Sequence, residues 1–224
     1  MKIGIIGYGH LGKAFVRGLV LTGFPQSDMV INARTEKTRE SVRKEFADIH
    51  VTGSKEELVN IADVVVIIVE PVHAKEVLSE IKAYDLDGKT LISFMAGITM
   101  AEIRNALDDK QNVVKLVRVM PSIAIQDGKG VMGITCEDTE DEALQEVLVL
   151  FSKLGYVLKL EEDSLNDITV TAASGLAFVA SLMDSYRKAC NTLFDNGEIS
   201  KEITLRVFEN VIDMVKKEDC SFED

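Results

Sequence analysis

The sequence predicts an α/β protein, with a doubly wound sheet domain over residues 1–160 and an all-helical domain over residues 161–224. Short β-branched apolar runs alternate with helical segments through the first domain, as βαβ units require. A glycine-rich segment follows the first run and opens a helix, as at a ligand-binding turn. Beyond Leu160 only helical spacing remains, and this change of period predicts the domain boundary.

Five short runs are predicted to be strands. Each run is apolar on both faces, which is typical of a buried parallel sheet covered by helices. Helical segments separate the runs, so we expect crossover connections that keep the strands parallel. The runs are Ile3–Ile6, Met29–Ile31, Val64–Val69, Thr90–Ser93 and Val113–Val117.

Three capping boxes predict where helices begin. In this motif a Ser or Thr side chain accepts a hydrogen bond from the backbone three residues later, and a Glu reaches back. The boxes are Ser54–Glu57, Thr99–Glu102 and Thr139–Glu142. Each precedes an apolar-periodic segment, so we expect a helix to follow each box.

Two long helices are predicted after residue 160. The first carries an apolar stripe and ends at Asn196–Gly197, and the second carries two stripes, so it needs two neighbours. So short a helix pair makes a thin core for a separate domain, which predicts that it packs on a second copy as a homodimer. The alternative is packing on its own sheet domain alone. The stripes are Leu176, Val179, Met183, Tyr186, Cys190 and Leu193, then Ile203, Val207, Val211 and Met214, with Leu205, Phe208, Ile212 and Val215.

Composition excludes several classes of partner. The 224 residues carry a formal net charge of −12, which repels nucleic acid and anionic lipid. The longest uninterrupted apolar run, Val64–Val69, is too short to span a bilayer, and no signal peptide precedes the first strand. Three dispersed cysteines and three dispersed histidines predict neither a disulfide framework nor a metal site. We therefore expect a cytoplasmic protein that acts on a small molecule.

The segment Gly7-Tyr8-Gly9-His10-Leu11-Gly12 predicts a dinucleotide-binding loop. Its first glycine permits the tight turn, its second permits close approach of a pyrophosphate, and its third permits close helix–sheet packing. The helix that follows offers free N–H groups and a positive dipole end to phosphate. The alternative is a glycine-rich turn without a ligand.

The end of the second predicted strand favours NADP over NAD. A site for NAD usually places Asp or Glu there to bind the ribose hydroxyls. This chain has Asn32-Ala33-Arg34-Thr35, with Lys37 close behind, and Arg34 can bind a 2′-phosphate with two hydrogen bonds. The alternative is that Arg34 and Lys37 are ordinary solvated residues at a helix start.

Two further segments follow strands and should lie at the carboxyl edge of the sheet, where open α/β folds bind ligands. They are Glu70-Pro71 and Ala96-Gly97. Small residues there would allow a nicotinamide ring to lie against the backbone. Either segment is equally compatible with a simple turn.

Four segments together resemble the pyrroline-5-carboxylate reductase family. They are residues 3–9, the Leu91–Thr99 segment with Ala-Gly-Ile-Thr, the Val117–Ser122 segment with Arg-Val-Met-Pro, and Ile168–Phe178. Their order and spacing match over nearly the whole chain. The second and third segments are far more specific than the glycine motif.

The resemblance implies a Rossmann domain, a C-terminal helical dimerisation domain and NADPH-dependent reduction of 1-pyrroline-5-carboxylate to L-proline. In this chemistry a hydride passes to the imine carbon and a proton to nitrogen. The glycines of the loop, with Arg34 and Thr35, would hold the dinucleotide. The nicotinamide side would be shaped by Ile68, Val69, Pro71, Ala96 and Gly97, and Glu70 is a further candidate for the cofactor. The substrate residues would be Met120, Pro121, Ser122 and Gly175, and the candidates for a catalytic group are Ser122, Thr169 and Ser174.

The chain departs from the family pattern at several positions. Glu70 stands where the family has Lys, Ser122 where it has Asn, Asn166 where it has Asp, and Leu176 where it has Pro. The segment Cys220–Asp224 resembles the stretch before the family's substrate loop, so we expect that loop to be missing. The departures leave two alternatives, a catalytically impaired NADP-binding relative with a regulatory role and a related oxidoreductase with another substrate.

Overall fold

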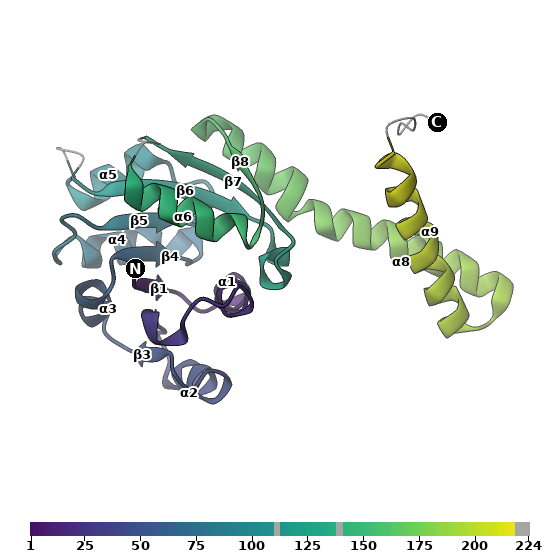
Figure 1. The fold of residues 1–224 in the computed structure, drawn as a ribbon, viewed down its shortest axis with the longest axis horizontal. Helices are drawn as coiled ribbons and strands as arrows, with labels where there is room; N and C mark the ends of the chain where they lie inside the picture. Colours follow the sequence, from purple (N-terminus) through teal and green to yellow (C-terminus); the bar gives the residue numbers. More distant parts are fainter. Residues whose placement is uncertain (110–112, 138–140, 218–224) are drawn as a thin grey trace. The chain divides into compact units, whose positions relative to one another are not determined.

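The structure, a computed structural model, describes residues 1–109, 113–137 and 141–217. It divides into two compact units, residues 1–173 and 174–224 (Figure 1). The division falls later than the boundary at residue 160 that the change of period predicted. The short helices after residue 160 pack on the sheet, and this contact makes them part of the first unit.

The first unit contains an eight-stranded sheet in the order β3-β2-β1-β4-β5-β6-β7-β8. Neighbouring strands from β3 to β6 are parallel, β7 is antiparallel to β6, and β8 is parallel to β7. This arrangement confirms the predicted doubly wound sheet. The strands are β1 (Ile3–Ile6), β2 (Met29–Asn32), β3 (His50–Thr52), β4 (Val64–Ile67), β5 (Thr90–Ser93), β6 (Lys115–Pro121), β7 (Gly130–Cys136) and β8 (Gly155–Lys159).

Every predicted run overlaps a strand, but the ends of three strands differ from the prediction. Strand β2 extends to Asn32 rather than Ile31, β4 stops at Ile67 rather than Val69, and β6 runs from Lys115 to Pro121 rather than Val113–Val117. Three strands, β3, β7 and β8, were not predicted. Strand β3 has only three residues, β7 contains two glycines, and β8 is only partly buried, so none forms a continuous apolar run.

Helices cover both faces of the sheet. One apolar core lies under α1, α2 and α6, and the other lies under α3, α4 and α5. Two rings from the first core, Phe15 and Phe94, meet edge to face with centroids 5.2 Å apart. The helices are α1 (His10–Leu21), α2 (Glu36–Glu45), α3 (Lys55–Ile61), α4 (Ala74–Ile81), α5 (Met100–Leu107), α6 (Glu142–Ser152) and α7 (Leu165–Ile168). Shorter turns are η1 (Gln26–Asp28), η2 (Pro71–His73), η3 (Ile123–Asp127), η4 (Glu162–Ser164) and the π-helical η5 (Thr169–Ala173).

The predicted helix starts have three outcomes. At α5 the Thr99–Glu102 box is complete in both directions. At α3 only half is made, because Ser54 accepts from the Glu57 N–H while the Glu57 carboxylate pairs with His50 and Thr52. Thr139 and Glu140 lie outside the described residues, and before α6 it is Asp141 that accepts from the Leu144 N–H at 3.2 Å.

Helix α1 rests on η3, the turn that joins β6 to β7. Gly18 makes this approach possible, because a Cβ there would lie 2.4 Å from the carbonyl oxygen of Ile125. The helix that begins at the glycine loop is therefore supported from a distant part of the chain.

The described part of the second unit is an antiparallel pair of helices, α8 (Gly175–Phe194) and α9 (Gly197–Val215). Asn196 caps α9 through hydrogen bonds from the N–H groups of Glu198 and Ile199. Tyr186 packs on Phe208 with ring centroids 6.0 Å apart, and Cys190 is buried. Most of the predicted apolar stripe of α8 is nevertheless exposed, including Leu176, Val179 and Leu193.

Candidate functional site

The glycine loop lies at the carboxyl end of β1, and its three glycines meet different surroundings. Gly7 has a φ of +105°, and a Cβ there would lie 2.1 Å from the Ile68 carbonyl oxygen. A Cβ on Gly12 would lie 2.5 Å from the Gly7 carbonyl oxygen, whereas one on Gly9 would meet no atom within 4 Å. Gly7 and Gly12 therefore serve the fold, and Gly9 leaves space for a ligand. Helix α1 has no side-chain cap at Gly9, so its first N–H groups remain available to an anion.

A hollow with a volume of about 400 Å³ opens beside this loop. It lies at the carboxyl ends of β1, β2 and β4, at the reversal of strand order where doubly wound sheets bind ligands. The structure brings nine of the predicted cofactor residues to its wall: Gly7, Tyr8, Gly9, Asn32, Arg34, Thr35, Ile68, Val69 and Glu70. The wall also includes Ile6, Ala33, Thr38, Gly53, Lys55, His73, Glu76 and Val77.

The turn between β2 and α2 gives this hollow a polar corner. The hydroxyls of Thr35 and Thr38 are 2.8 Å apart, and Arg34 is exposed beside them. Arg39 fixes the turn, because its Nη1 donates to the carbonyl oxygens of Ala33 at 2.7 Å and Arg34 at 3.2 Å. This corner suits a phosphate group, because it combines two hydroxyls, the exposed guanidinium of Arg34 and the start of α2.

Two acidic residues near the hollow, Glu36 and Glu80, are held by basic partners, whereas Glu70 and Glu76 are exposed on its wall. The carboxylate of Glu36 pairs with Arg39 and Arg43, and these hydrogen bonds lower the pKa of Glu36. Lys55 pairs with Glu80 at 2.6 Å. Glu70 is exposed on the wall beside η2, where it adds negative charge.

Tyr8 occupies the middle of the glycine loop, but its ring is buried among apolar side chains. Its hydroxyl has no hydrogen-bond partner among the residues that the structure describes. Burial raises the pKa of Tyr8 to about 12, with a further rise from Glu45 and a smaller opposing effect of Arg17. This side chain therefore packs the loop against α1 and α2 as a neutral phenol.

Seven other predicted cofactor residues do not line the hollow: His10, Leu11, Gly12, Lys37, Pro71, Ala96 and Gly97. Ala96 and Gly97 follow β5, whose last residue, Ser93, is aligned with Ile67 of β4. The pair thus lies at the same edge of the sheet as the hollow. Gly97 has a φ of +72°, a conformation that favours glycine.

The predicted substrate segment ends β6 at the same edge. Met120, Pro121 and Ser122 are all buried. The Ser122 hydroxyl accepts from the Val131 N–H at 3.0 Å, and the Ser122 N–H donates to the Val131 carbonyl oxygen. This serine therefore anchors β6 to β7.

The remaining catalytic candidates fall in different units. Thr169 begins η5 in the first unit, where its hydroxyl donates to the Leu165 carbonyl oxygen at 3.1 Å. Ser174 and Gly175 begin the second unit. The roles of all three residues stay predictions.

His73 follows Pro71, and the sequence allows it either as a residue at the ligand edge or as an ordinary helix-start residue; the structure places it on the wall. Sequence reasoning missed several other residues that line the hollow. Thr38 was detectable, because a residue three positions after Thr35 lies on the same face of a helix. Lys55, Glu76 and Val77 come from α3 and α4, and only the crossover connections bring them to this edge. No local sequence signal marks them.

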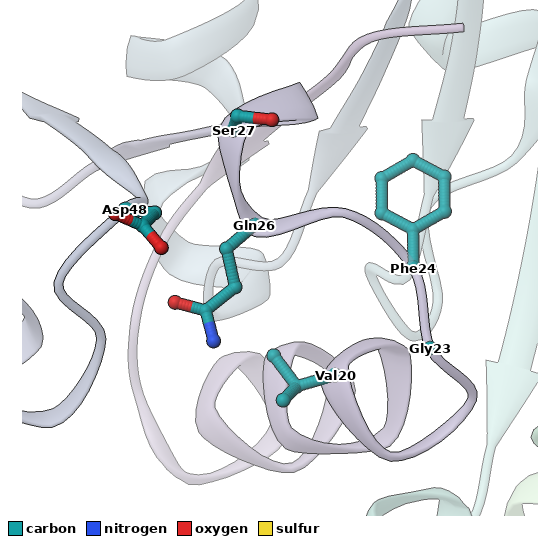
Figure 2. Close-up of a pocket in the computed structure, with 6 residues that line it drawn as sticks. All are labelled: Val20, Gly23, Phe24, Gln26, Ser27 and Asp48. Atoms are coloured by element: carbon teal, nitrogen blue, oxygen red, sulfur yellow. The ribbon is translucent and has the colours of Figure 1, made fainter.

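A second recess, of about 470 Å³, lies elsewhere. It is lined by Val20, Gly23, Phe24, Gln26, Ser27 and Asp48 (Figure 2). Gln26 and Asp48 precede β2 and β3, so this recess is at the amino ends of the strands, away from the glycine loop. Asp48 is its only titratable side chain among these residues, and the recess carries no catalytic set.

Residues 1–109, 113–137 and 141–217 contain no group of three or more His, Cys, Asp or Glu side chains that could hold a metal ion. One helical stretch, Glu162–Phe194, is long and apolar enough to cross a membrane by length and composition. Polar residues interrupt this stretch, so it contains no long uninterrupted apolar run in the sequence.

Comparisons with known proteins agree on one group of enzymes. A family model described as "NADP oxidoreductase coenzyme F420-dependent" matches residues 2–97. The pyrroline-5-carboxylate reductase of Vibrio alginolyticus is 31% identical over 188 residues, which are 82% of this chain and 67% of that protein. The enzyme of the same name from Corynebacterium melassecola is 28% identical over 221 residues, or 96% of this chain and 80% of that protein.

Solved structures give the same fold. Plasmodium falciparum pyrroline carboxylate reductase, a structure with NADP bound, has a TM-score of 0.87 and 24% identity, over 99% of this chain and 80% of that chain. The 1-pyrroline-5-carboxylate reductase of Streptococcus pyogenes has a TM-score of 0.85 and 22% identity, over 100% and 83% of the two chains. At these identities the likeness establishes the fold.

Proposed function

The chain belongs to the pyrroline-5-carboxylate reductase family, and on this premise we propose that it reduces 1-pyrroline-5-carboxylate to L-proline with NADPH. The observation that carries the proposal is the open space at Gly9, beside the uncapped start of α1. A glycine that the fold does not need, at the edge where doubly wound sheets bind ligands, fits a pyrophosphate.

The polar corner supports NADPH over NADH as the reductant. Arg34, Thr35 and Thr38 offer one positive charge and two hydroxyls to a 2′-phosphate. The one carboxylate in the first turn of α2, Glu36, is held by two arginines and so is poorly placed to accept from a ribose 2′-hydroxyl. NADH would lose the phosphate contacts and gain no carboxylate partner.

The protein's contribution to the reaction is to position the two reactants and exclude water. Bound NADPH would supply the hydride that reduces the imine carbon. The strand end Met120–Ser122 and the backbone at Ala96–Gly97 lie at the edge where the nicotinamide would sit, and they would hold the ring and the substrate. The candidates to deliver the proton to nitrogen are Ser122, Thr169 and Ser174.

The exposed apolar surface of α8 supports a homodimer. Phe178, Leu182 and Phe194 are more than half exposed on this helix. A second copy of the chain would cover these side chains and remove their apolar surface from water, which is energetically favourable. The same surface accounts for the apolar character of the stretch after Glu162 without a membrane, and we place the enzyme in the cytoplasm with a role in proline biosynthesis.

A second candidate function rests on Glu70. This carboxylate lines the hollow where the family carries a lysine, so it would repel the coenzyme phosphates rather than attract them. The chain would then be a catalytically impaired NADP-binding relative with a regulatory role. A related oxidoreductase with another substrate is the remaining alternative.

The test is NADPH oxidation by the 224-residue chain with 1-pyrroline-5-carboxylate, beside NADH and a control without substrate. We expect substrate-dependent oxidation of NADPH, with NADH slower. The Gly9→Ala variant is a matched probe, because a methyl group there would enter the phosphate space without touching the protein. It should keep its fold and lose NADPH binding. NADPH binding without turnover of any imine would favour the regulatory alternative.

A further inference from the structure

One carboxylate joins three segments of the first unit at the predicted substrate side of the sheet edge. Glu162 Oε1 accepts a hydrogen bond from Arg118 Nη1 at 2.6 Å and from the Met100 N–H at 2.7 Å. Arg118 belongs to β6, Met100 begins α5, and Glu162 begins η4. Arg118 is only 3% exposed, whereas the Glu162 side chain is 30% exposed, so the guanidinium is buried and the carboxylate is partly open to solvent.

Each joined segment carries residues assigned above to the nicotinamide or the substrate. Arg118 stands two residues before Met120 on the same strand. Met100 stands three residues after Gly97, and η4 leads through α7 to Thr169. Turn η5, where Thr169 lies, packs on β6 and β7. A shift at Glu162 would therefore reach all three segments together.

The energetics of the pair favour a geometric role over a stabilising one. Burial of the Arg118 guanidinium costs desolvation free energy, which offsets part of its attraction to Glu162. The Nε of Arg118 is also buried without a hydrogen-bond partner in the part of the chain that the structure describes. What the ion pair does provide is directed hydrogen bonds that fix one arrangement of the three segments.

A second carboxylate lies near the same guanidinium. Glu102 closes the capping box of α5 through the N–H and hydroxyl of Thr99, both at 2.8 Å. These hydrogen bonds lower the pKa of Glu102, and the positive charge of Arg118 contributes. Arg118 therefore has one acidic group on η4 and another on the first turn of α5. The hydrogen-bonded contact from the Arg118 strand to the start of α5 runs through Glu162.

We propose that Arg118 and Glu162 are positioning residues for the nicotinamide half of the site, holding the Ala96–Gly97 turn, Met120 and η5 in register. The inference rests on the proposed function, because it assumes that a nicotinamide ring lies at this edge. The pair has no part in binding the adenosine half, whose proposed contacts lie in the glycine loop after β1 and at the turn between β2 and α2. Removal of the ion pair should therefore affect binding of the nicotinamide half of the coenzyme and leave binding of the adenosine half unchanged.

The experiment compares NADPH with adenosine 2′,5′-bisphosphate, which contains only the adenosine half. Dissociation constants are measured by calorimetry for the wild-type chain, Glu162→Gln, Arg118→Lys and the control Glu161→Gln. The control removes the same charge from the adjacent, exposed residue. Glu162→Gln keeps an oxygen that can accept both hydrogen bonds, so the chain should still fold, and thermal unfolding checks this.

We expect Glu162→Gln to weaken NADPH about tenfold and to lower kcat by one to two orders of magnitude, because small misplacements of reacting groups are costly. Binding of the bisphosphate should stay within about twofold, as should every property of Glu161→Gln. Arg118→Lys keeps the charge without the planar fork and should fall between the wild type and Glu162→Gln.

Two results would overturn the positioning role. One is equal weakening of NADPH and bisphosphate in a folded Glu162→Gln variant, and the other is unchanged NADPH binding and kcat. A wild-type chain that binds NADPH no more tightly than the bisphosphate would also overturn the positioning role, because the nicotinamide half would then make no contact that contributes to binding. A wild-type chain that binds neither ligand would instead overturn the proposed function.

Discussion

Arg34 and Lys37 are both basic residues at the start of α2, yet the structure separates them. Arg34 lines the hollow beside Thr35 and Thr38, whereas Lys37 does not reach its wall. Sequence reasoning assigned both to the coenzyme, because spacing alone does not show which side of a helix start faces a ligand. A contact to phosphate depends on that direction.

Substitution of the two residues tests this difference. We expect Arg34→Ala to raise the Kd for NADPH about ten- to a hundredfold, since a hydrogen bond to a charged group contributes about 1.5–3 kcal/mol. Lys37→Ala should change it less than about threefold. Neither should alter the Kd for NADH, which lacks the 2′-phosphate. Equal losses from both variants in calorimetric titrations would contradict the assignment.

Tyr8 makes the free energy of unfolding decrease at alkaline pH. Its pKa lies near 12 in the folded chain and near 10 when unfolded, so the folded state favours the neutral phenol. The contribution is fully present below pH 10 and is lost as the pH rises from 10 to 12. A shift of this size corresponds to about 3 kcal/mol of unfolding free energy.

The Tyr8→Phe variant checks this prediction by urea unfolding at several pH values. It should lose the part of the alkaline decline that Tyr8 causes. At pH 7 it should be as stable as the wild type or more stable by about 1 kcal/mol, because the buried hydroxyl has no partner among the described residues. An undiminished decline between pH 10 and 12 in this variant would show that other groups cause it.

At the scale of the element, the capping box of α5 is the start signal that the structure reproduces completely. Its Thr99 accepts from the Glu102 N–H at 3.2 Å, and Glu102 accepts from the Thr99 N–H and hydroxyl. The box holds the first turn of α5, which also carries the Met100 N–H bound to Glu162. Local sequence and tertiary contact therefore agree at this helix start.

Thr99→Ala should lower the unfolding free energy by about 1 kcal/mol, the usual cost of losing such a cap. Thr99→Ser keeps the hydroxyl and should stay close to the wild type. Because Thr99 lowers the pKa of Glu102, the difference between wild type and Thr99→Ala should shrink as the pH falls through the folded pKa of Glu102. Denaturant unfolding at pH 7 and pH 3 measures both effects, and a serine variant as unstable as the alanine variant would refute the cap.

Elements with a strong local signal were predictable, and those defined by pairing were not. Apolar runs such as Val64–Ile67 predict buried strands, and the glycine-rich segment predicts a tight turn. Strand β7 has Gly130 and Gly133, whose missing side chains make room for Ile125 and for Ile168, so tertiary packing placed it in the sheet. The same holds for the site: the loop glycines and Arg34 were predicted, but Lys55 and Val77 reach the hollow only through folded crossovers.

At the scale of the whole molecule, the two helices of the second unit leave much of their apolar surface exposed, because two helices alone cannot bury it. Leu182 is 61% exposed on α8. The predicted homodimer would cover this face, and sedimentation velocity measures whether it forms. We expect the wild-type chain to sediment as a dimer.

Leu182→Glu should shift the chain toward the monomer, because a charge buried in an apolar interface without a partner is costly. The matched control is Leu21→Glu, which changes an equally exposed leucine, 62% exposed, at the end of α1 in the first unit. The control should stay dimeric. A Leu182→Glu chain that remains a dimer would place the interface elsewhere.

The contact between α1 and η3 has a consequence for the order of events during synthesis. The glycine loop leaves the ribosome early, but the turn that supports its helix at Gly18 contains Ile125 and leaves much later. A nascent chain arrested before residue 125 should therefore hold α1 loosely and expose it to protease. The first motif to be translated would be among the last to mature, as expected of parallel sheets built from distant contacts.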